Sequence, residues 1–154
     1  MFDVDGTLVR SMQSEAVLFP RACELALGIG YVSNDWNSYR TPSDAGIVTE
    51  LVERHFDRPC TADDRRRVED SFLALMRDAI ESEPHTYREV AGAAGLLTQL
   101  RSRPDTFLAI ATGGWGTSAR LKLSAAGLNV DGIPLASSHD AEGKETIMRL
   151  ALAR

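Results

Sequence analysis

The chain alternates between short apolar runs and longer amphipathic stretches. The opening residues MFDVD are mostly apolar and are followed by Gly6, which predicts a short strand that ends in a turn. Residues 106–112 (TFLAIAT) and 133–138 (IPLASS) predict two more strands. Apolar residues at helical spacing accompany these strands at residues 90–100, at 117–126 and from Gly143-Lys144 onward. Strands that alternate with helices are typical of a parallel sheet in an α/β fold.

Residues 11–85 interrupt this alternation, because their pattern is helical throughout. In the first helix, Pro20 is expected to mark a start or a kink, since proline cannot donate a main-chain hydrogen bond. A loop rich in Gly, Asn, Ser and Asp follows at residues 28–44. Ser43 and Thr61 then stand where N-cap residues are expected, each ahead of an amphipathic stretch.

The run ESEPHTY (81–87) ends the helical segment and returns the chain to the α/β pattern. We therefore predict two domains. Residues 1–10 and 86–154 form an α/β domain with a parallel sheet, and residues 11–85 form a helical domain inserted into it.

Composition limits the classes of function. The chain has 154 residues, of which 44% are hydrophobic and 25% charged, as is usual for a globular protein. Its net charge of −5 argues against a general nucleic-acid surface, which needs a basic stripe. Its two cysteines form no disulfide framework, and no signal peptide or membrane-spanning run is recognised, so we expect a cytoplasmic protein without a membrane partner. The sequence does not indicate an oligomeric state.

Polar groups follow each predicted strand. Asp3 and Asp5 are two residues apart and would leave a strand on one face. Thr112 and Gly113 end the second strand, and Lys144 follows the third. Because ligands of open α/β sheets bind beyond the carboxyl ends of the strands, we expect these groups to converge. Carboxylates can act as nucleophiles or hold Mg²⁺, while a hydroxyl, main-chain amides and an ammonium can hold phosphate oxygens.

The motifs FDVDGTLV, AIATGG and a downstream GK resemble the first three motifs of the haloacid dehalogenase (HAD) superfamily. The layout is similar to its phosphoglycolate-phosphatase-like branch, which implies a Rossmann-like core with an inserted helical cap. The resemblance implies a Mg²⁺-dependent phosphomonoester hydrolase acting on a small phosphorylated metabolite. Asp3 would form an aspartyl-phosphate, and Asp5 would act as acid and base. The Asp3 side chain and the Asp5 carbonyl would bind Mg²⁺, and Thr112, the Gly113 amide and Lys144 would hold the phosphate.

Alternatives remain within and beyond this resemblance. An alkoxide leaving group needs a proton, so Asp5 favours a phosphatase over a dehalogenase, although a phosphomutase uses the same aspartate pair. The chain ends with IMRLALAR and carries no fourth acidic motif, so Mg²⁺ is expected to bind weakly. The chain would then be a fragment of a longer enzyme, be completed by a partner, or be a non-catalytic module that binds a phosphometabolite or a protein.

The sequence predicts the roles of several further residues less specifically. Lys122 is a rival to Lys144, but its position in the middle of a helix predicts a solvated side chain. Tyr39 and Arg40 are candidate contacts to the far end of a substrate, since an Arg fork suits a carboxylate or a second phosphate. Trp115, which follows the glycine pair, is a candidate wall of the pocket. Asp140 is expected to be a turn residue.

Overall fold

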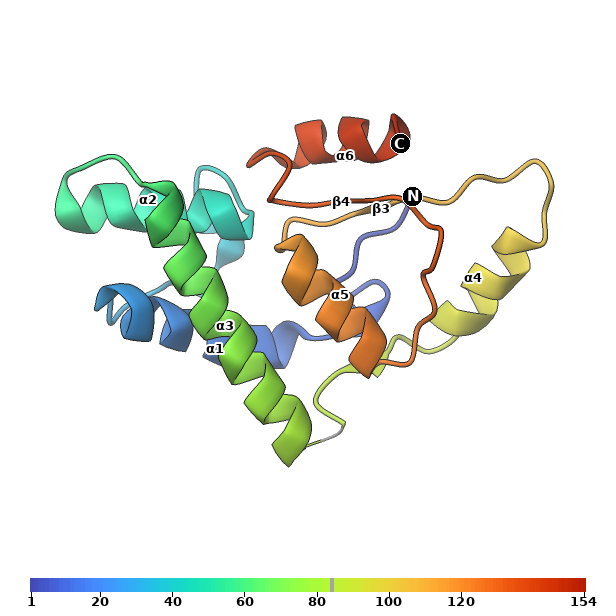
Figure 1. The fold of residues 1–154 in the computed structure, drawn as a ribbon, viewed down its shortest axis with the longest axis horizontal. Helices are drawn as coiled ribbons and strands as arrows, with labels where there is room; N and C mark the ends of the chain where they lie inside the picture. The colour runs from blue at the N-terminus through green and yellow to red at the C-terminus, as the bar shows by residue number, and fades with distance from the viewer. Residues whose placement is uncertain (84) are drawn as a thin grey trace.

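The computed structural model describes residues 1–83 and 85–154, and this part of the chain has a mixed α/β fold. Its elements are β1 (Val9–Arg10), α1 (Met12–Leu27), the 3₁₀ helix η1 (Trp36–Ser38), α2 (Asp44–Phe56), α3 (Ala62–Ser82), β2 (Arg88–Glu89), α4 (Ala93–Arg101), β3 (Ile110–Ala111), α5 (Gly116–Ala125), β4 (Leu135–Ala136) and α6 (Lys144–Leu152). Helices α1, α2 and α3 lie on one side of the molecule, and β3 and β4 lie on the other with α5 and α6 on opposite sides of the strand pair (Figure 1).

The central strands are parallel, as the sequence predicts, but they are short. Strand β3 pairs with β4 through Ile110 and Leu135, and on its other side Ile110 forms a bridge with Phe2. Two hydrogen bonds hold this bridge, from the Phe2 N–H to the Ala109 carbonyl and from the Ala111 N–H to the Phe2 carbonyl, both 2.9 Å. Phe2, β3 and β4 therefore lie side by side in that order.

The strand expected over residues 1–5 is reduced to two isolated bridges, from Phe2 to Ile110 and from Asp5 to Val9. The chain turns directly after Asp3, because the Val4 carbonyl accepts hydrogen bonds from the N–H groups of Leu8 and Val9, both at 2.9 Å. Gly6 adopts a φ of +76°, a conformation that glycine tolerates best. Asp3 and Asp5 are thus presented by a turn and not by consecutive positions of a strand.

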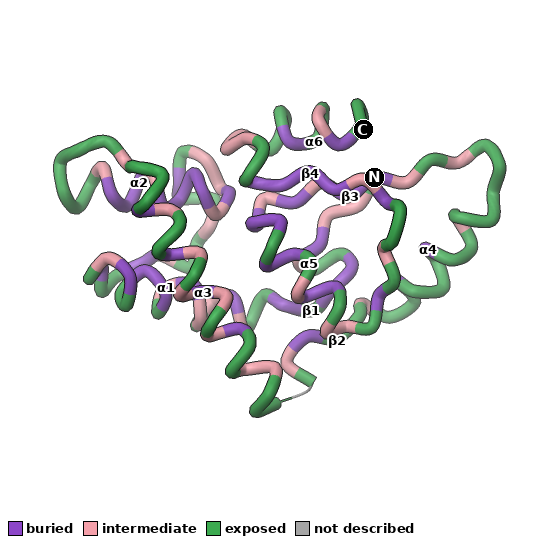
Figure 2. The backbone as a smooth tube through the Cα atoms, viewed as in Figure 1, coloured by how far each residue is buried: buried purple, intermediate pink, exposed green. Residues whose placement is uncertain are grey.

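The helical segment packs on the rest of the chain through aromatic side chains. The Phe19 ring of α1 lies 5.6 Å from Phe72 of α3 and 5.9 Å from Trp115, which precedes α5. All three are buried, and Figure 2 shows buried backbone where these helices face one another. Pro20 lies well inside α1 and does not mark its start.

Both predicted N-caps are confirmed. The Ser43 hydroxyl accepts a hydrogen bond from the Gly46 N–H at 3.2 Å. Thr61 and Asp64 form a reciprocal capping box, in which the Thr61 hydroxyl accepts from the Asp64 N–H at 3.2 Å and Asp64 accepts from the Thr61 N–H at 2.9 Å. Arg58 donates two hydrogen bonds to Asp64, which lower the pKa of that carboxyl. These caps fix where α2 and α3 begin.

Over residues 1–83 and 85–154, none of the helices combines the length and the apolar character needed to cross a bilayer.

Candidate active site

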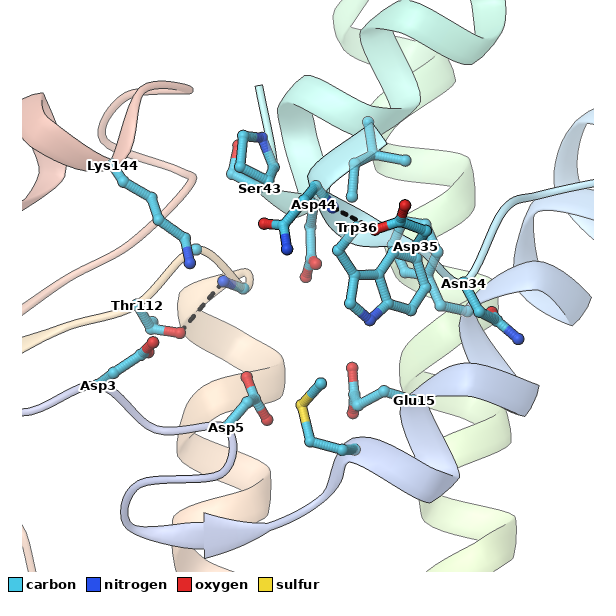
Figure 3. A pocket seen from close by; sticks show the side chains of 17 residues that line it. Asp3, Asp5, Glu15, Asn34, Asp35, Trp36, Ser43, Asp44, Thr112 and Lys144 are labelled. Carbon is cyan, nitrogen blue, oxygen red and sulfur yellow. Dashed lines mark hydrogen bonds between the residues drawn. The ribbon is translucent and has the colours of Figure 1, made fainter. Parts of the chain in front are cut away.

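A cavity of about 350 Å³ lies between the helical segment and the carboxyl ends of the central strands. The turn after Phe2, the segment after β3 and the start of α6 line one side, and α1, η1 and the start of α2 line the other (Figure 3). All five residues predicted to do chemistry line this cavity: Asp3, Asp5, Thr112, Gly113 and Lys144. The structure therefore brings together groups that are up to 141 residues apart in the sequence, counting from Asp3 to Lys144.

Asp3 lies at the strand side of the cavity, and its carboxylate points toward Thr112 (Figure 3). One oxygen, Oδ1, accepts a hydrogen bond from the Val4 N–H at 2.7 Å. Burial raises the pKa of the Asp3 carboxyl, while the Val4 N–H and the Lys144 charge act in the opposite direction. Its second oxygen is left for a ligand.

Two hydrogen-bond donors hold one oxygen of the Asp5 carboxylate in place. Its Oδ1 accepts hydrogen bonds from the Ser11 hydroxyl at 2.5 Å and from the Lys122 ammonium at 2.7 Å. The other oxygen, Oδ2, faces Gly114, where a Cβ atom would lie 3.7 Å from it. The anchored oxygen orients the carboxylate so that Oδ2 is the one available to the cavity.

Thr112 and the two glycines form the floor near Asp3. The Thr112 hydroxyl accepts a hydrogen bond from the Gly114 N–H at 3.1 Å and is buried. A side chain at Gly113 would crowd both neighbours, because its Cβ would lie 3.1 Å from Lys144 Cε and 3.2 Å from the Pro42 carbonyl oxygen. Lys144, the first residue of α6, is exposed and extends its side chain toward Thr112 (Figure 3). A cation, a hydroxyl and close main chain are the groups that hold phosphate oxygens.

The solvent exposure of the Lys122 side chain differs from the prediction. The sequence predicts a solvated side chain, yet Lys122 is 0% exposed. Its ammonium pairs with Asp5 at 2.7 Å and with Glu15 Oε1 at 3.3 Å. Burial acts to lower the pKa of Lys122, but the carboxylates of Glu15, Asp5 and Asp44 outweigh it and raise the pKa. Lys122 therefore stays a cation, and it positions Asp5 from beneath the cavity.

Glu15 and Asp44 are two acidic residues of the cavity that the sequence did not single out. Burial raises the pKa of Glu15 to about 8, although the Lys122 charge opposes the shift. Burial likewise raises the pKa of Asp44 to about 7, and Asp44 Oδ2 accepts a hydrogen bond from the Trp115 N–H at 2.9 Å. Their only sequence signal is an acidic residue in the first turn of a helix, which is common at solvent-exposed positions.

The raised pKa of Glu15 has a consequence for stability. Folding disfavours ionisation of this carboxyl, so its contribution to stability is fully present below about pH 4.5 and is lost as the pH rises through about 8. We expect Glu15→Gln to reduce the loss of stability between about pH 5 and 8.5 by on the order of 1–3 kcal/mol. Urea unfolding at several pH values measures this, with Glu81→Gln at an exposed position as the control. Parallel pH profiles for Glu15→Gln and the unmutated protein would contradict the assignment.

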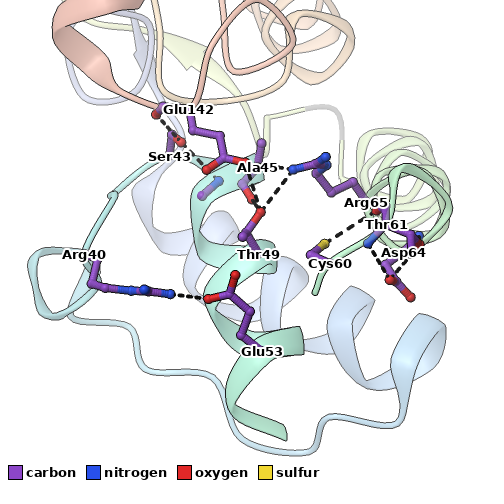
Figure 4. A network of polar contacts seen from close by, with 11 residues as sticks. Arg40, Ser43, Ala45, Thr49, Glu53, Cys60, Thr61, Asp64, Arg65 and Glu142 are labelled. Carbon is purple, nitrogen blue, oxygen red and sulfur yellow. Dashed lines mark hydrogen bonds and ion pairs between the residues drawn. The ribbon is translucent and has the colours of Figure 1, made fainter. Parts of the chain in front are cut away.

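Three predicted substrate contacts lie outside the lining of this cavity. Trp115 is 1% exposed and belongs to the aromatic core with Phe19. The Tyr39 ring is buried, and its hydroxyl accepts a hydrogen bond from the Ser33 N–H at 2.8 Å. Arg40 forms an ion pair with Glu53 of α2 (Figure 4) and a second one with the buried Glu50 of the same helix. The tryptophan that lines the cavity is instead Trp36 of η1, in the same predicted loop, and Phe19 of α1 lines it as well.

Polar contacts join the helical segment to the loop before α6. The Ser43 hydroxyl donates to the Glu142 carbonyl at 2.7 Å, and the Glu142 side chain accepts from the Thr49 hydroxyl at 3.1 Å and from Arg65 at 2.7 Å (Figure 4). Asp140, expected to be a turn residue, accepts from the Ser137 N–H at 2.9 Å. The Glu142 contacts place α2 close to Lys144 and so define one wall of the cavity.

The cavity offers a limited set of ligands for a metal ion. Mg²⁺ prefers oxygen ligands and is commonly bound through one or two carboxylates together with water and substrate phosphate. The Asp3 carboxylate and the neighbouring Asp5 fit that pattern. No group of three His, Cys, Asp or Glu residues arranged for a metal was found in the described part of the chain. The residues present fit a Mg²⁺ ion that takes most of its ligands from water and phosphate.

Comparisons with known proteins bear on the fold. No family model matches the sequence, and no curated protein matches it. A hydrolase from Pseudomonas syringae has a similar structure, with a TM-score of 0.71 and 19% identity, over 99% of this chain and 68% of that one. A predicted phosphoglycolate phosphatase from Haemophilus somnus 129PT is similar with a TM-score of 0.51 and 18% identity, over 82% of this chain and 56% of that one.

These similarities show that the chain has the fold of the two proteins. They support the α/β fold that the sequence predicts. The chain spans about two thirds of the length of the Pseudomonas protein and just over half of the Haemophilus protein.

Proposed function

We propose that this protein is a phosphomonoester hydrolase of the HAD type that acts on a small phosphorylated metabolite. The observation that carries the proposal is the convergence of Asp3, Asp5, Thr112, Gly113 and Lys144 in one cavity. The parallel arrangement of Phe2, β3 and β4 supports a Rossmann-like core. The position of α1, η1 and α2 across the cavity supports an inserted cap, with residues 11–85 as cap and 1–10 and 86–154 as core.

In this proposal the free oxygen of Asp3 attacks the phosphorus atom, and the bond from phosphorus to the leaving oxygen breaks. Lys144 and the Thr112 hydroxyl hold the oxygens of the transferring group, where charge stabilisation and positioning lower the barrier. Asp5 gives its proton to the leaving alkoxide through Oδ2, because Oδ1 is already engaged by Ser11 and Lys122. Mg²⁺, held by the Asp3 carboxylate and the Asp5 carbonyl, would neutralise negative charge on the phosphate.

The second half of the reaction uses the same residues. Asp5, now ionised, takes a proton from a water molecule, and the resulting hydroxide attacks the phosphorus atom of the aspartyl-phosphate. The bond between phosphorus and the Asp3 oxygen breaks, which restores Asp3 and releases inorganic phosphate. Lys122 stays paired with Asp5 in both halves and keeps Oδ2 directed at the cavity.

Release of phosphate from p-nitrophenyl phosphate, with Mg²⁺ and with a chelator, tests this proposal. We expect turnover that requires Mg²⁺. Lys144→Met should lower kcat/KM by about 10- to 100-fold, because it removes the cation that faces the phosphate. A folded protein that releases no phosphate from any of a panel of monoesters would overturn it.

Binding without turnover is the second candidate function. The observation that favours it is that no three His, Cys, Asp or Glu residues in residues 1–83 and 85–154 are arranged to hold a metal ion. A protein of this kind would bind inorganic phosphate or vanadate, detected by calorimetry, without releasing phosphate from esters. A phosphomutase would instead pass the phosphoryl group to a second hydroxyl, so the ratio of phosphate released to ester consumed separates it from a hydrolase.

A further inference from the structure

We propose that the alcohol part of the preferred substrate carries no carboxylate and no second phosphate, and is instead a neutral hydroxylated or amine-bearing group. This inference rests on the proposed function, because it concerns the same cavity. It follows from the distribution of charge on the cavity walls.

The cavity is lined by one cation and several acids. Lys144 is the single lysine or arginine among its described lining residues, and it lies on the side of Asp3, where the phosphate would bind. Five carboxyl groups line the same cavity: Asp3, Asp5, Glu15, Asp35 and Asp44. The other nearby cation, Lys122, lies beneath the cavity and is already engaged by Asp5 and Glu15. A substrate phosphate would use the one accessible cation, so a second anionic group would have none.

The wall across from Lys144 would contact the alcohol part. Asp44, Trp36 and Glu15 follow one another along this wall (Figure 3). Phe19 and Ile47 add apolar surface. An anion placed here would lose its hydration and, above the pKa values of Glu15 and Asp44, would be repelled by their carboxylates. Both effects are costly at partly buried sites.

The same wall suits groups that donate hydrogen bonds. Glu15, Asp35 and Asp44 line it, and the oxygens of their carboxyl groups can accept hydrogen bonds. A hydroxyl or ammonium group of a ligand would therefore be stabilised close to them. The Trp36 indole provides a flat apolar face and an N–H donor beside these acids.

The preferred substrate inferred for this chain differs from the substrate in the name of one structurally similar protein. The Haemophilus protein is named a predicted phosphoglycolate phosphatase, and the glycolate part of that ester carries a carboxylate. We expect phosphoglycolate to be a poor substrate for this chain, because its carboxylate would lie among Glu15, Asp35 and Asp44 with no cation to pair with.

Two sets of matched phosphate esters test the inference. The first set is phosphoglycolate, 2-hydroxyethyl phosphate and phosphoethanolamine, which differ mainly in a carboxylate, a hydroxymethyl or an aminomethyl group. The second is phenyl phosphate and 4-carboxyphenyl phosphate. At about pH 8.5, above the raised pKa values of Glu15 and Asp44, we expect kcat/KM for each carboxylate ester to be at least about tenfold below that of its partners. Carboxylate esters that react as fast as their partners would overturn the inference.

Turnover of phenyl phosphate reports on the proposed function independently of this preference. If no ester were turned over, the proposed function would fail, and calorimetric affinities for the same esters would still test the charge preference. The neutral and amine-bearing esters are then expected to bind more tightly than the carboxylate esters. Equal affinities would overturn the inference.

Two variants link the preference to the cavity. Asp44→Asn keeps an oxygen that can accept from the Trp115 N–H but removes the charge, and Asp35→Asn does the same at the exposed rim, where Asp35 accepts from the Asn37 N–H. Each should reduce the ratio between neutral and carboxylate esters by about threefold or more. Asp70→Asn, an exposed acid of α3 paired with Arg66 outside the cavity, is the control and should leave the ratio unchanged. A ratio that none of the cavity variants changes would contradict the role of these charges.

Discussion

Asp3→Asn is expected to lower kcat/KM for p-nitrophenyl phosphate by at least about a thousandfold, because it removes the nucleophile of a covalent mechanism. Asparagine has nearly the same shape as aspartate and keeps an oxygen that can accept from the Val4 N–H. The variant should therefore fold as the unmutated protein does. Steady-state kinetics, together with urea unfolding to establish the folded state, measure the effect.

The control for this loss is an acidic residue outside the cavity. Asp70→Asn removes one exposed carboxylate from α3 and should leave kcat/KM unchanged. If Asp3→Asn kept the activity of the unmutated protein while folded, Asp3 could not be the nucleophile.

Lys122→Met should have the largest effect on stability, a loss of about 3–5 kcal/mol in the free energy of unfolding. Lys122 is completely buried between Asp5 and Glu15, and methionine would leave these acids without their cation. The matched variant is Lys144→Met, which changes an exposed lysine of the same cavity. We expect Lys144→Met to change stability by less than about 0.5 kcal/mol while reducing activity.

Urea unfolding of both lysine variants makes this comparison. A double variant, Lys122→Met with Glu15→Gln, should recover part of the stability lost by Lys122→Met, because it leaves one fewer uncompensated carboxylate. Equal stabilities for Lys122→Met and Lys144→Met would show that the buried ion pairs with Lys122 do not stabilise the fold.

The features that the sequence predicted correctly depend mainly on local interactions or on a general rule of α/β sheets. Ser43 and Thr61 cap their own helices, so their roles can be read from neighbouring residues. The convergence of Asp3, Thr112 and Lys144 follows from the rule that the carboxyl ends of parallel strands meet at one edge.

The features that the sequence did not predict depend on tertiary partners. Lys122 lies between two leucines on a helix without a strong apolar face, so its burial is apparent only once Asp5 and Glu15 are placed around it. The position of Trp115 has the same cause. It follows the glycine pair in the sequence, but Phe19 and Phe72 pack against its ring and it is buried. Trp36, which the sequence did not single out, packs on Phe19 and lines the cavity.

The most direct test of the central claim is to look for phosphate on Asp3. The protein is mixed with p-nitrophenyl phosphate and Mg²⁺, quenched in acid during turnover, digested and analysed by mass spectrometry. The account predicts a peptide containing Asp3 that is heavier by one phosphoryl group, and no such peptide from Asp3→Asn. Turnover without that adduct, or an adduct that persists in Asp3→Asn, would contradict the account.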